Sequence, residues 1–152
     1  MGLSHGGYLT LLALTKEPGL FRAGIDLMVP TDRQSPFLNR NRRLHIGGNE
    51  EENPDLYDRV SPITSVKDLQ APLLIIHSDR DRNVAPGMTY SFVDELERQN
   101  KPYDLVIYPN EAHGLADPAH QLDSYRRIMN FFDRHLKPSG VEHTEPSTAP
   151  SR

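Results

Sequence analysis

The sequence predicts an α/β fold built on a parallel sheet, and three features of its pattern indicate this. A continuous apolar run at 73–77, behind Pro72, is typical of a strand that is covered on both faces. Apolar residues at helical spacing follow it at 87–99. A second strand at 104–108 and a second helix at 117–136 continue this alternation, which is typical of parallel α/β sheets.

The rest of the chain fits around these elements. An apolar segment without proline predicts a helix at 6–16, which ends at Pro18-Gly19, and a short apolar strand is expected at 21–29. Prolines and glycines interrupt 31–68, where we expect short helices and loops that cover the sheet. The segment 138–152 is rich in Pro, Ser, Thr and Glu and is expected to be a disordered tail. The expected sheet therefore has about three parallel strands.

Composition excludes several classes of protein. The chain has 152 residues, of which 36% are hydrophobic and 25% charged, and a net charge of −4, which is typical of one soluble globular domain. The basic cluster of Arg40, Arg42 and Arg43 is short and is balanced by nearby glutamates, so we expect no nucleic-acid surface. Without cysteine there is neither a disulfide nor a thiolate metal site, and no cofactor is expected. No segment predicts a signal peptide or a membrane span, so we expect a cytoplasmic protein.

The N-terminus carries a motif for nucleophilic catalysis. Residues 2–6 fit G-x-S-x-G, with Ser4 at the centre and a further glycine at Gly7. This motif forms a sharp strand-to-helix turn that exposes the serine oxygen, and Gly2 and Gly6 are expected to prevent side-chain collisions in it. Backbone N–H groups at the start of the following helix would face developing negative charge. By itself the motif could also be an ordinary glycine-rich turn.

The order of two later residues strengthens the interpretation. A serine nucleophile needs a base, and the base needs a carboxylate that orients it. Asp81 follows the strand at 73–77 and His113 follows the strand at 104–108, so both are expected at the carboxyl ends of parallel strands, together with Ser4. Asp79 is the rival for the acid. The other histidines are set aside because His77 is expected to end a buried strand, and the rest lack a strand-end setting: His45, His120, His135 and His143.

Three stretches resemble the prolyl oligopeptidase family of serine peptidases, in its acylaminoacyl-peptidase and dipeptidyl-peptidase-like branch. They are GLSHGGYLT, GNEEENPDLYDRVSPITSVKDLQAPLLIIHSDRDRNVAP and YPNEAHGL. The resemblance extends over residues 1–137 and implies the C-terminal part of an α/β-hydrolase domain. It implies that Asp81, before x-N-V, is the acid, that His113 of E-x-H-G is the base, and that the backbone N–H of His5 is half of an oxyanion hole.

The sequence also departs from this family. His5 stands where tyrosine is usual and Ser78 where glycine is usual, and the aromatic residues of the dipeptidyl-peptidase specificity pocket are not evident after Pro30. We also expect that the upstream strands of the domain are missing, which would leave an open edge at 21–29 and lead to self-association or to pairing with an upstream complementing segment.

The predicted function is hydrolysis of peptide or acylated-peptide bonds through an acyl-enzyme, with Ser4, Asp81 and His113 as the triad. Two alternatives stay open. One is an esterase on the same fold, and the other is a catalytically silent truncated fragment or partner surface.

Overall fold

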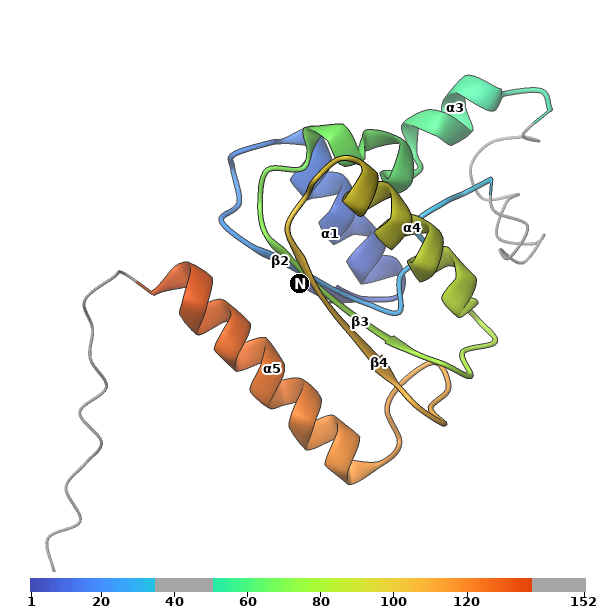
Figure 1. The fold of residues 1–152 in the computed structure, drawn as a ribbon. Coiled ribbons are helices and arrows are strands. Elements are labelled where there is room, and N and C mark those ends of the chain that lie inside the picture. Colours follow the sequence, from blue (N-terminus) through green and yellow to red (C-terminus); the bar gives the residue numbers. More distant parts are fainter. Residues whose placement is uncertain (35–50, 138–152) are drawn as a thin grey trace, which may run out of the picture.

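A computed structural model describes residues 1–34 and 51–137 of the chain. It contains a four-stranded parallel sheet in the order β1-β2-β3-β4 (Figure 1). The strands are β1 (Gly2–Leu3), β2 (Gly24–Leu27), β3 (Leu73–Ser78) and β4 (Tyr103–Tyr108). The helices are α1 (His5–Lys16), α3 (Pro54–Arg59), the 3₁₀ helix η2 (Pro62–Asp68), α4 (Pro86–Arg98) and α5 (Pro118–Leu136).

Each strand pairs with the strand that comes next in the sequence. The α/β class and the expected strands and helices are confirmed, and the structure adds β1, whose two residues pair with Asp26 and Leu27 of β2. The expectation of an open edge at 21–29 is wrong, because β2 lies between β1 and β3. The outer strands of the described sheet are β1 and β4.

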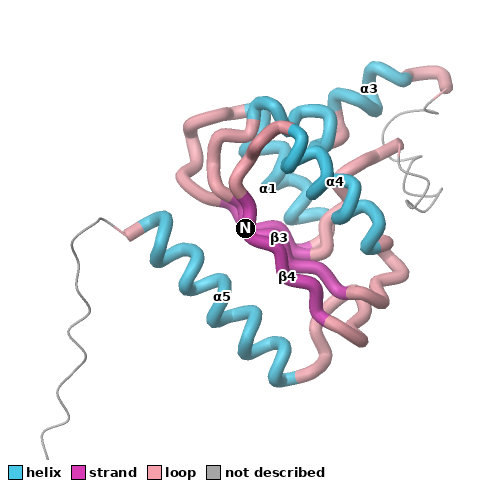
Figure 2. Tube along the Cα trace, in the orientation of Figure 1, coloured by secondary structure: helices cyan, strands magenta, loops and turns pink. Residues whose placement is uncertain are grey.

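The helices cover the sheet in two layers. Helices α1 and α4 lie on one face and α5 lies on the other (Figures 1 and 2). Alternate residues of β3 serve these two layers: Leu73 and Ile75 pack with Leu11 of α1 and Phe92 of α4, whereas Leu74 and Ile76 pack toward α5. The 3₁₀ helix η2 packs on α1 and α4, and α3 contacts η2, so this segment covers the helical layer on one face of the sheet.

Helix ends follow local chemistry. Helices α3, α4 and α5 each begin with proline, whose fixed φ suits the first helical position. The Asp117 carboxylate accepts a hydrogen bond from the Ala119 N–H and caps α5. Residues 138–152 and the arginine cluster at 40–43 lie outside the described residues.

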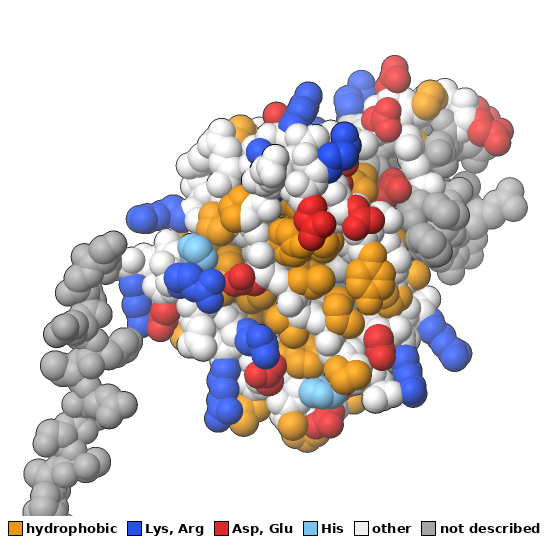
Figure 3. Space-filling view, viewed as in Figure 1, with side chains coloured by type: hydrophobic (Ala, Val, Ile, Leu, Met, Phe, Trp, Pro, Cys, Tyr) orange, Lys and Arg blue, Asp and Glu red, His pale blue; other side chains and the backbone are white. Residues whose placement is uncertain are grey.

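Helix α5 buries only some of its apolar residues. Ile128 and Phe131 are buried against the sheet, but Leu122, Tyr125 and Met129 are more than half exposed. The sheet presents only β2, β3 and β4 to this helix, so a single face of α5 is covered. Hydrophobic side chains also reach the surface between α4 and α5, where β4 is the outer strand (Figure 3).

Asp26 is an exception in the apolar strand β2. It is 2% exposed, and its Oδ2 atom has no hydrogen-bond partner among the described residues. Burial raises the pKa of Asp26 well above its ordinary range, because the surroundings disfavour the charged form. The native protein therefore holds this proton at pH values where the unfolded chain has released it.

Replacing Asp26 with asparagine should increase stability at high pH. The unfolded chain loses the Asp26 proton above about pH 4, so the free energy of unfolding of the wild type falls as pH rises beyond that point. Asp26→Asn removes this titration, and we expect its free energy of unfolding to exceed that of the wild type by about 1 kcal/mol at pH 8. Urea unfolding at pH 4 and pH 8 measures the difference in the free energy of unfolding between Asp26→Asn and the wild type, which should be smaller at pH 4. Asp94→Asn, at an exposed position of α4, is the control and should change little. A lower stability of Asp26→Asn at pH 8 would contradict this account.

Candidate active site

Ser4 occupies a sharp turn between β1 and α1. Its φ is 53° and its ψ −119°, a region that residues other than glycine seldom adopt. The Ser4 N–H donates to the Leu27 carbonyl at 2.7 Å, which continues the pairing of β1 with β2. The Ser4 side chain does not cap α1, so its oxygen is not occupied by the helix. This geometry is that of the strained strand-to-helix turn that the motif predicts.

Two glycines permit the turn because other parts of the chain pack too closely against them to leave room for a side chain. A side-chain carbon at position 2 would lie 2.2 Å from the carbonyl carbon of Gly6, and one at position 7 would lie 2.1 Å from Cγ2 of Val29 and 2.7 Å from the carbonyl oxygen of Gly2. Nothing lies within 4 Å of the corresponding position on Gly6. The expectation for Gly2 therefore holds, but the second glycine that packing requires is Gly7 and not Gly6.

Asp81 and His113 are joined by a direct hydrogen bond. Oδ2 of Asp81 lies 2.7 Å from Nδ1 of His113. The Asp81 side chain is fully buried and that of His113 is 17% exposed. When Nδ1–H donates to the carboxylate, Nε2 of His113 is left with a free lone pair that can accept a proton. The rival acid Asp79 is exposed, and its N–H is bonded to the Tyr108 carbonyl.

The loop after β3 holds the Asp81 carboxylate in place. Its Oδ1 atom accepts hydrogen bonds from the N–H groups of Asn83 at 2.8 Å and Val84 at 2.9 Å. His77, fully buried in β3, lies with Nε2 3.0 Å from the Val84 carbonyl and 3.5 Å from Oδ2 of Asp81. Burial lowers the pKa of His77, whereas the Val84 carbonyl and the Asp81 charge act in the opposite direction. A neutral His77 thus connects β3 to the loop that carries Asp81, in agreement with the structural role expected for it.

The loop after β4 presents His113 on a tight turn. The Gly114 N–H donates to the Ala112 carbonyl at 2.9 Å, so His113 is the central residue of a three-residue turn. Ser78, which replaces the usual glycine, donates its hydroxyl proton to the same Ala112 carbonyl and links the two loops.

Glu111 is a supporting residue that the sequence interpretation missed. Its carboxylate accepts hydrogen bonds from the N–H groups of Ala116 at 2.8 Å and Asp117 at 3.0 Å, and it contacts Nδ1 of His120 at 2.8 Å. The hydrogen bond from Ala116, followed by those from His120 and Asp117, lowers the pKa of Glu111. The sequence feature that could have indicated this role is the position of Glu111 in the E-x-H-G motif, a few residues before the helix that starts at Asp117-Pro118.

The predicted site residues all lie at the carboxyl ends of strands. Ser4 follows β1, Asp81 follows β3 and His113 follows β4, and the four strands are parallel. His5 is the first residue of α1, so no helical carbonyl accepts its N–H. The structure thus brings Asp81 and His113 into contact and puts Ser4 at the same end of the sheet. This arrangement is suited to acyl transfer by a serine.

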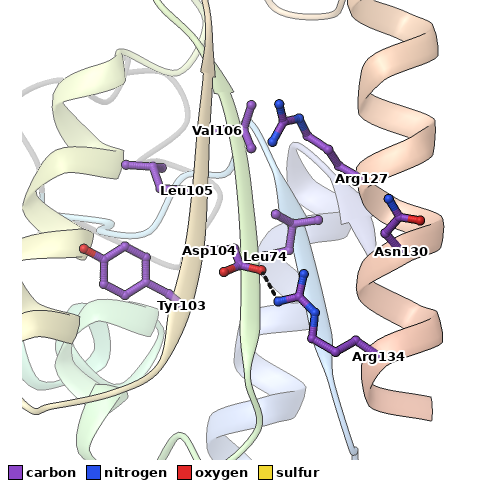
Figure 4. Close-up of a pocket in the computed structure, with 8 residues that line it drawn as sticks. All are labelled: Leu74, Tyr103, Asp104, Leu105, Val106, Arg127, Asn130 and Arg134. Atoms are coloured by element: carbon purple, nitrogen blue, oxygen red, sulfur yellow. Dashed lines mark hydrogen bonds and ion pairs between the residues drawn. The ribbon is translucent and has the colours of Figure 1, made fainter. Parts of the chain in front are cut away.

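Other parts of the described chain carry no comparable chemistry. A cavity of about 430 Å³ lies between β4 and α5, lined by Leu74, Tyr103, Asp104, Leu105, Val106, Arg127, Asn130 and Arg134 (Figure 4). Arg134 points across it to Asp104, with 3.0 Å between nitrogen and oxygen, and none of the predicted site residues lines it. Within residues 1–34 and 51–137, no three His, Asp or Glu side chains are grouped to hold a metal ion. No described helix is both long and apolar enough to cross a membrane.

Comparison with known families identifies the chain. The model of the prolyl oligopeptidase family matches residues 1–139. The chain belongs to the prolyl oligopeptidase family. This membership agrees with the resemblance in the sequence and with the turn at Ser4.

Individual members of the family are similar in sequence over most of the chain. It is 29% identical to dipeptidyl peptidase family member 6 of Caenorhabditis elegans over 147 residues, which cover 90% of this chain and 20% of that protein. It is 28% identical to the uncharacterized peptidase YtmA of Bacillus subtilis, with 74% of this chain and 46% of that protein covered. The chain therefore spans less than half of the length of either relative.

Solved structures share the fold. Dipeptidyl peptidase 4 of Porphyromonas gingivalis superimposes with a TM-score of 0.84 at 30% identity, over 89% of this chain and 19% of that one. The acylaminoacyl peptidase of Pyrococcus horikoshii superimposes with a TM-score of 0.80 at 30% identity, over 93% of this chain and 24% of that one. The described sheet and helices are thus a part of an α/β-hydrolase peptidase domain.

Adding a methyl group at Gly2 should disrupt the turn, whereas adding one at Gly6 should not. Gly2→Ala forces a side-chain carbon against the backbone of α1, which cannot move without shifting the helix that starts after Ser4. We expect Gly2→Ala to lower the melting temperature by several degrees and to slow labelling of Ser4 by a fluorophosphonate at least about 100-fold, because a displacement of ~1 Å costs about that much in rate. Gly6→Ala is the matched control and should label at close to the wild-type rate. Equal labelling of the two variants would contradict the packing argument.

Proposed function

We propose that the chain carries the catalytic triad of a serine peptidase that cleaves peptide or acylated-peptide bonds through an acyl-enzyme. In this proposal Ser4 is the nucleophile, His113 the general base and Asp81 the residue that orients His113. The observation that carries it is the 2.7 Å contact between the buried Asp81 and the partly exposed His113, at the sheet end where Ser4 occupies a strained turn.

The reaction begins with proton transfer. Nε2 of His113 takes the hydroxyl proton of Ser4 while Oγ attacks the substrate carbonyl, whose oxygen becomes negatively charged. The N–H of His5 donates to that oxygen, as the first amide of α1. His113 then gives the proton to the leaving amine as the C–N bond breaks, and an ester with Ser4 remains. Water attacks this ester by the same route in reverse and releases the acyl product.

The surroundings of Asp81 support its orienting role. Two backbone N–H groups hold Oδ1 of Asp81, which leaves Oδ2 for His113. The imidazole is therefore kept in the tautomer whose Nε2 can accept a proton, and the carboxylate balances the positive charge that His113 acquires.

Family membership supports a peptide substrate. Relatives with similar sequences are named dipeptidyl peptidase and dipeptidyl aminopeptidase, and similar structures are named acylaminoacyl peptidase. An esterase would use the same acyl transfer, so substrate comparison is needed to separate the two.

Ser4→Ala should abolish both labelling and turnover. In an active preparation, a fluorophosphonate should modify Ser4 alone. Both an acylated aminoacyl amide and a p-nitrophenyl ester should be hydrolysed. Removing the Ser4 hydroxyl should reduce both activities by about 10⁶-fold, since the acyl-enzyme cannot form. Ser91→Ala, at an exposed position of α4, is the control and should retain both. Labelling that survives Ser4→Ala would refute the assignment, and turnover of the ester alone would favour the esterase.

Replacement of the acid should separate Asp81 from Asp79. Asp81→Asn keeps the shape of the side chain but holds His113 in the wrong tautomer, and such a loss costs about 10⁴-fold in kcat. Asp79→Asn changes an exposed side chain and should cost less than about threefold. Steady-state hydrolysis of the acylated amide measures both. The reverse ranking would move the acid to Asp79.

A further inference from the structure

Arg33 is a buried cation on the loop that follows β2. Its exposed fraction is 7%, and its Nε atom is buried without a hydrogen-bond partner among the described residues. Within residues 1–34 and 51–137 no carboxylate forms an ion pair with Arg33. Arginine is rarely this buried without an anion, because removing the charge from water is costly.

The position of Arg33 is well defined on two sides. Its backbone N–H donates to the Ser61 hydroxyl at 2.8 Å, and that hydroxyl in turn donates to the Tyr57 carbonyl. Its guanidinium carbon lies 3.9 Å above the ring centre of Tyr8, and the Tyr8 hydroxyl is bonded to the Val60 carbonyl at 2.8 Å. The cation–π contact offsets part of the desolvation cost, but it does not use the N–H donors of the guanidinium.

Tyr8 connects this cation to the helix that begins after the candidate nucleophile. The Tyr8 N–H donates to the Ser4 carbonyl at 3.0 Å, so Tyr8 is one helical turn from Ser4, and its ring also contacts the ring of His5, with 5.3 Å between centres. One turn of helix rises about 5.4 Å. Arg33 thus stacks on Tyr8, and Tyr8 in turn contacts His5, the residue after Ser4. The loop that carries Arg33 follows β2 and starts at the end of the sheet where Ser4 lies.

We propose that Arg33 determines specificity by binding a carboxylate of the substrate. The proposal rests on the function assigned above to Ser4. The occupant that we infer is the side chain of an aspartate or glutamate whose own carbonyl Ser4 attacks, because Arg33 is connected to the residues beside Ser4 through Tyr8 and His5. The planar guanidinium can hold a carboxylate with two parallel hydrogen bonds. The other possible source of the same group is the C-terminal carboxylate of the leaving peptide.

Matched substrates test the proposal in an active preparation of the protein. Acetyl-glutamyl and acetyl-glutaminyl amides of aminomethylcoumarin have the same shape and differ in charge, and their leaving group has no carboxylate. We expect kcat/KM for the glutamyl substrate to exceed that for the glutaminyl substrate by about 10- to 100-fold, as a hydrogen-bonded charge pair would produce. Arg33→Gln should abolish this preference for the glutamyl substrate, and Arg33→Lys should retain part of it. Arg59→Gln, at an exposed position of α3, should leave it unchanged.

The remaining outcomes separate the two proposals. Equal rates for both substrates in the wild type together with no preference for a free C-terminus, or equal losses for both substrates in Arg33→Gln, would mean that Arg33 serves packing alone and would overturn the inference. A preference for peptides with a free C-terminus over amidated ones, lost in Arg33→Gln while the glutamyl preference is absent, would move the carboxylate to the leaving side. Failure to hydrolyse an acetyl-alanyl amide, together with no labelling of Ser4, would refute the function itself.

Discussion

The parallel pairing of β3 with β4 is the constraint on which the candidate site depends. Six residue pairs align the two strands, from Leu73 with Tyr103 to Ser78 with Tyr108, so both strands end at the same level. The loops that follow them are then bonded to each other, through the Arg80 N–H to the Glu111 carbonyl and the Ser78 hydroxyl to the Ala112 carbonyl. A shift of this register by one residue would turn the side chains to the opposite faces and separate Asp81 from His113.

Several buried polar groups lie at this end of a mostly apolar core. The hydrophobic clusters between the sheet and its helices consist mainly of leucine, isoleucine, valine and aromatic side chains, and Asp26 of β2 is a buried exception. His77 and Asp81 are buried at and just after the end of β3, and Arg33 is buried in the loop after β2. The backbone of Val84 bonds to both His77 and Asp81, through its carbonyl and its N–H group respectively. These hydrogen bonds offset the cost of burying the two side chains once the loop is formed. Arg33 has a ring beneath it but no anion among the described residues, and this imbalance makes it the residue most suited to a charged ligand.

The described part of the chain also presents surfaces that a larger peptidase domain would cover. The chain covers about a fifth of several relatives, and β1 contributes only two residues to the sheet. Apolar side chains line a groove beside β1 and α1, among them Met1, Leu9 and Phe21, and others are exposed on α5. Such patches are typical of contact surfaces.

Sequence alone was sufficient for the α/β class and for the long strands and helices, because apolar periodicity is a local signal. The serine motif and the strand-end positions made Ser4, Asp81 and His113 candidates, and the family resemblance favoured Asp81 as the acid; their catalytic roles stay a prediction. The sequence did not predict β1, since two residues are too few to form a pattern, and it placed the sheet edge wrongly for that reason. It assigned the second tight glycine to Gly6 because the motif names that position, whereas the contact with Val29, distant in the sequence, requires Gly7. The stacking of Arg33 on Tyr8, the Oδ2 atom of Asp26 that lacks a hydrogen-bond partner among the described residues, and the bonds of Glu111 were also decided by tertiary structure. Each of these features depends on segments that come into contact with the side chain only when the chain folds.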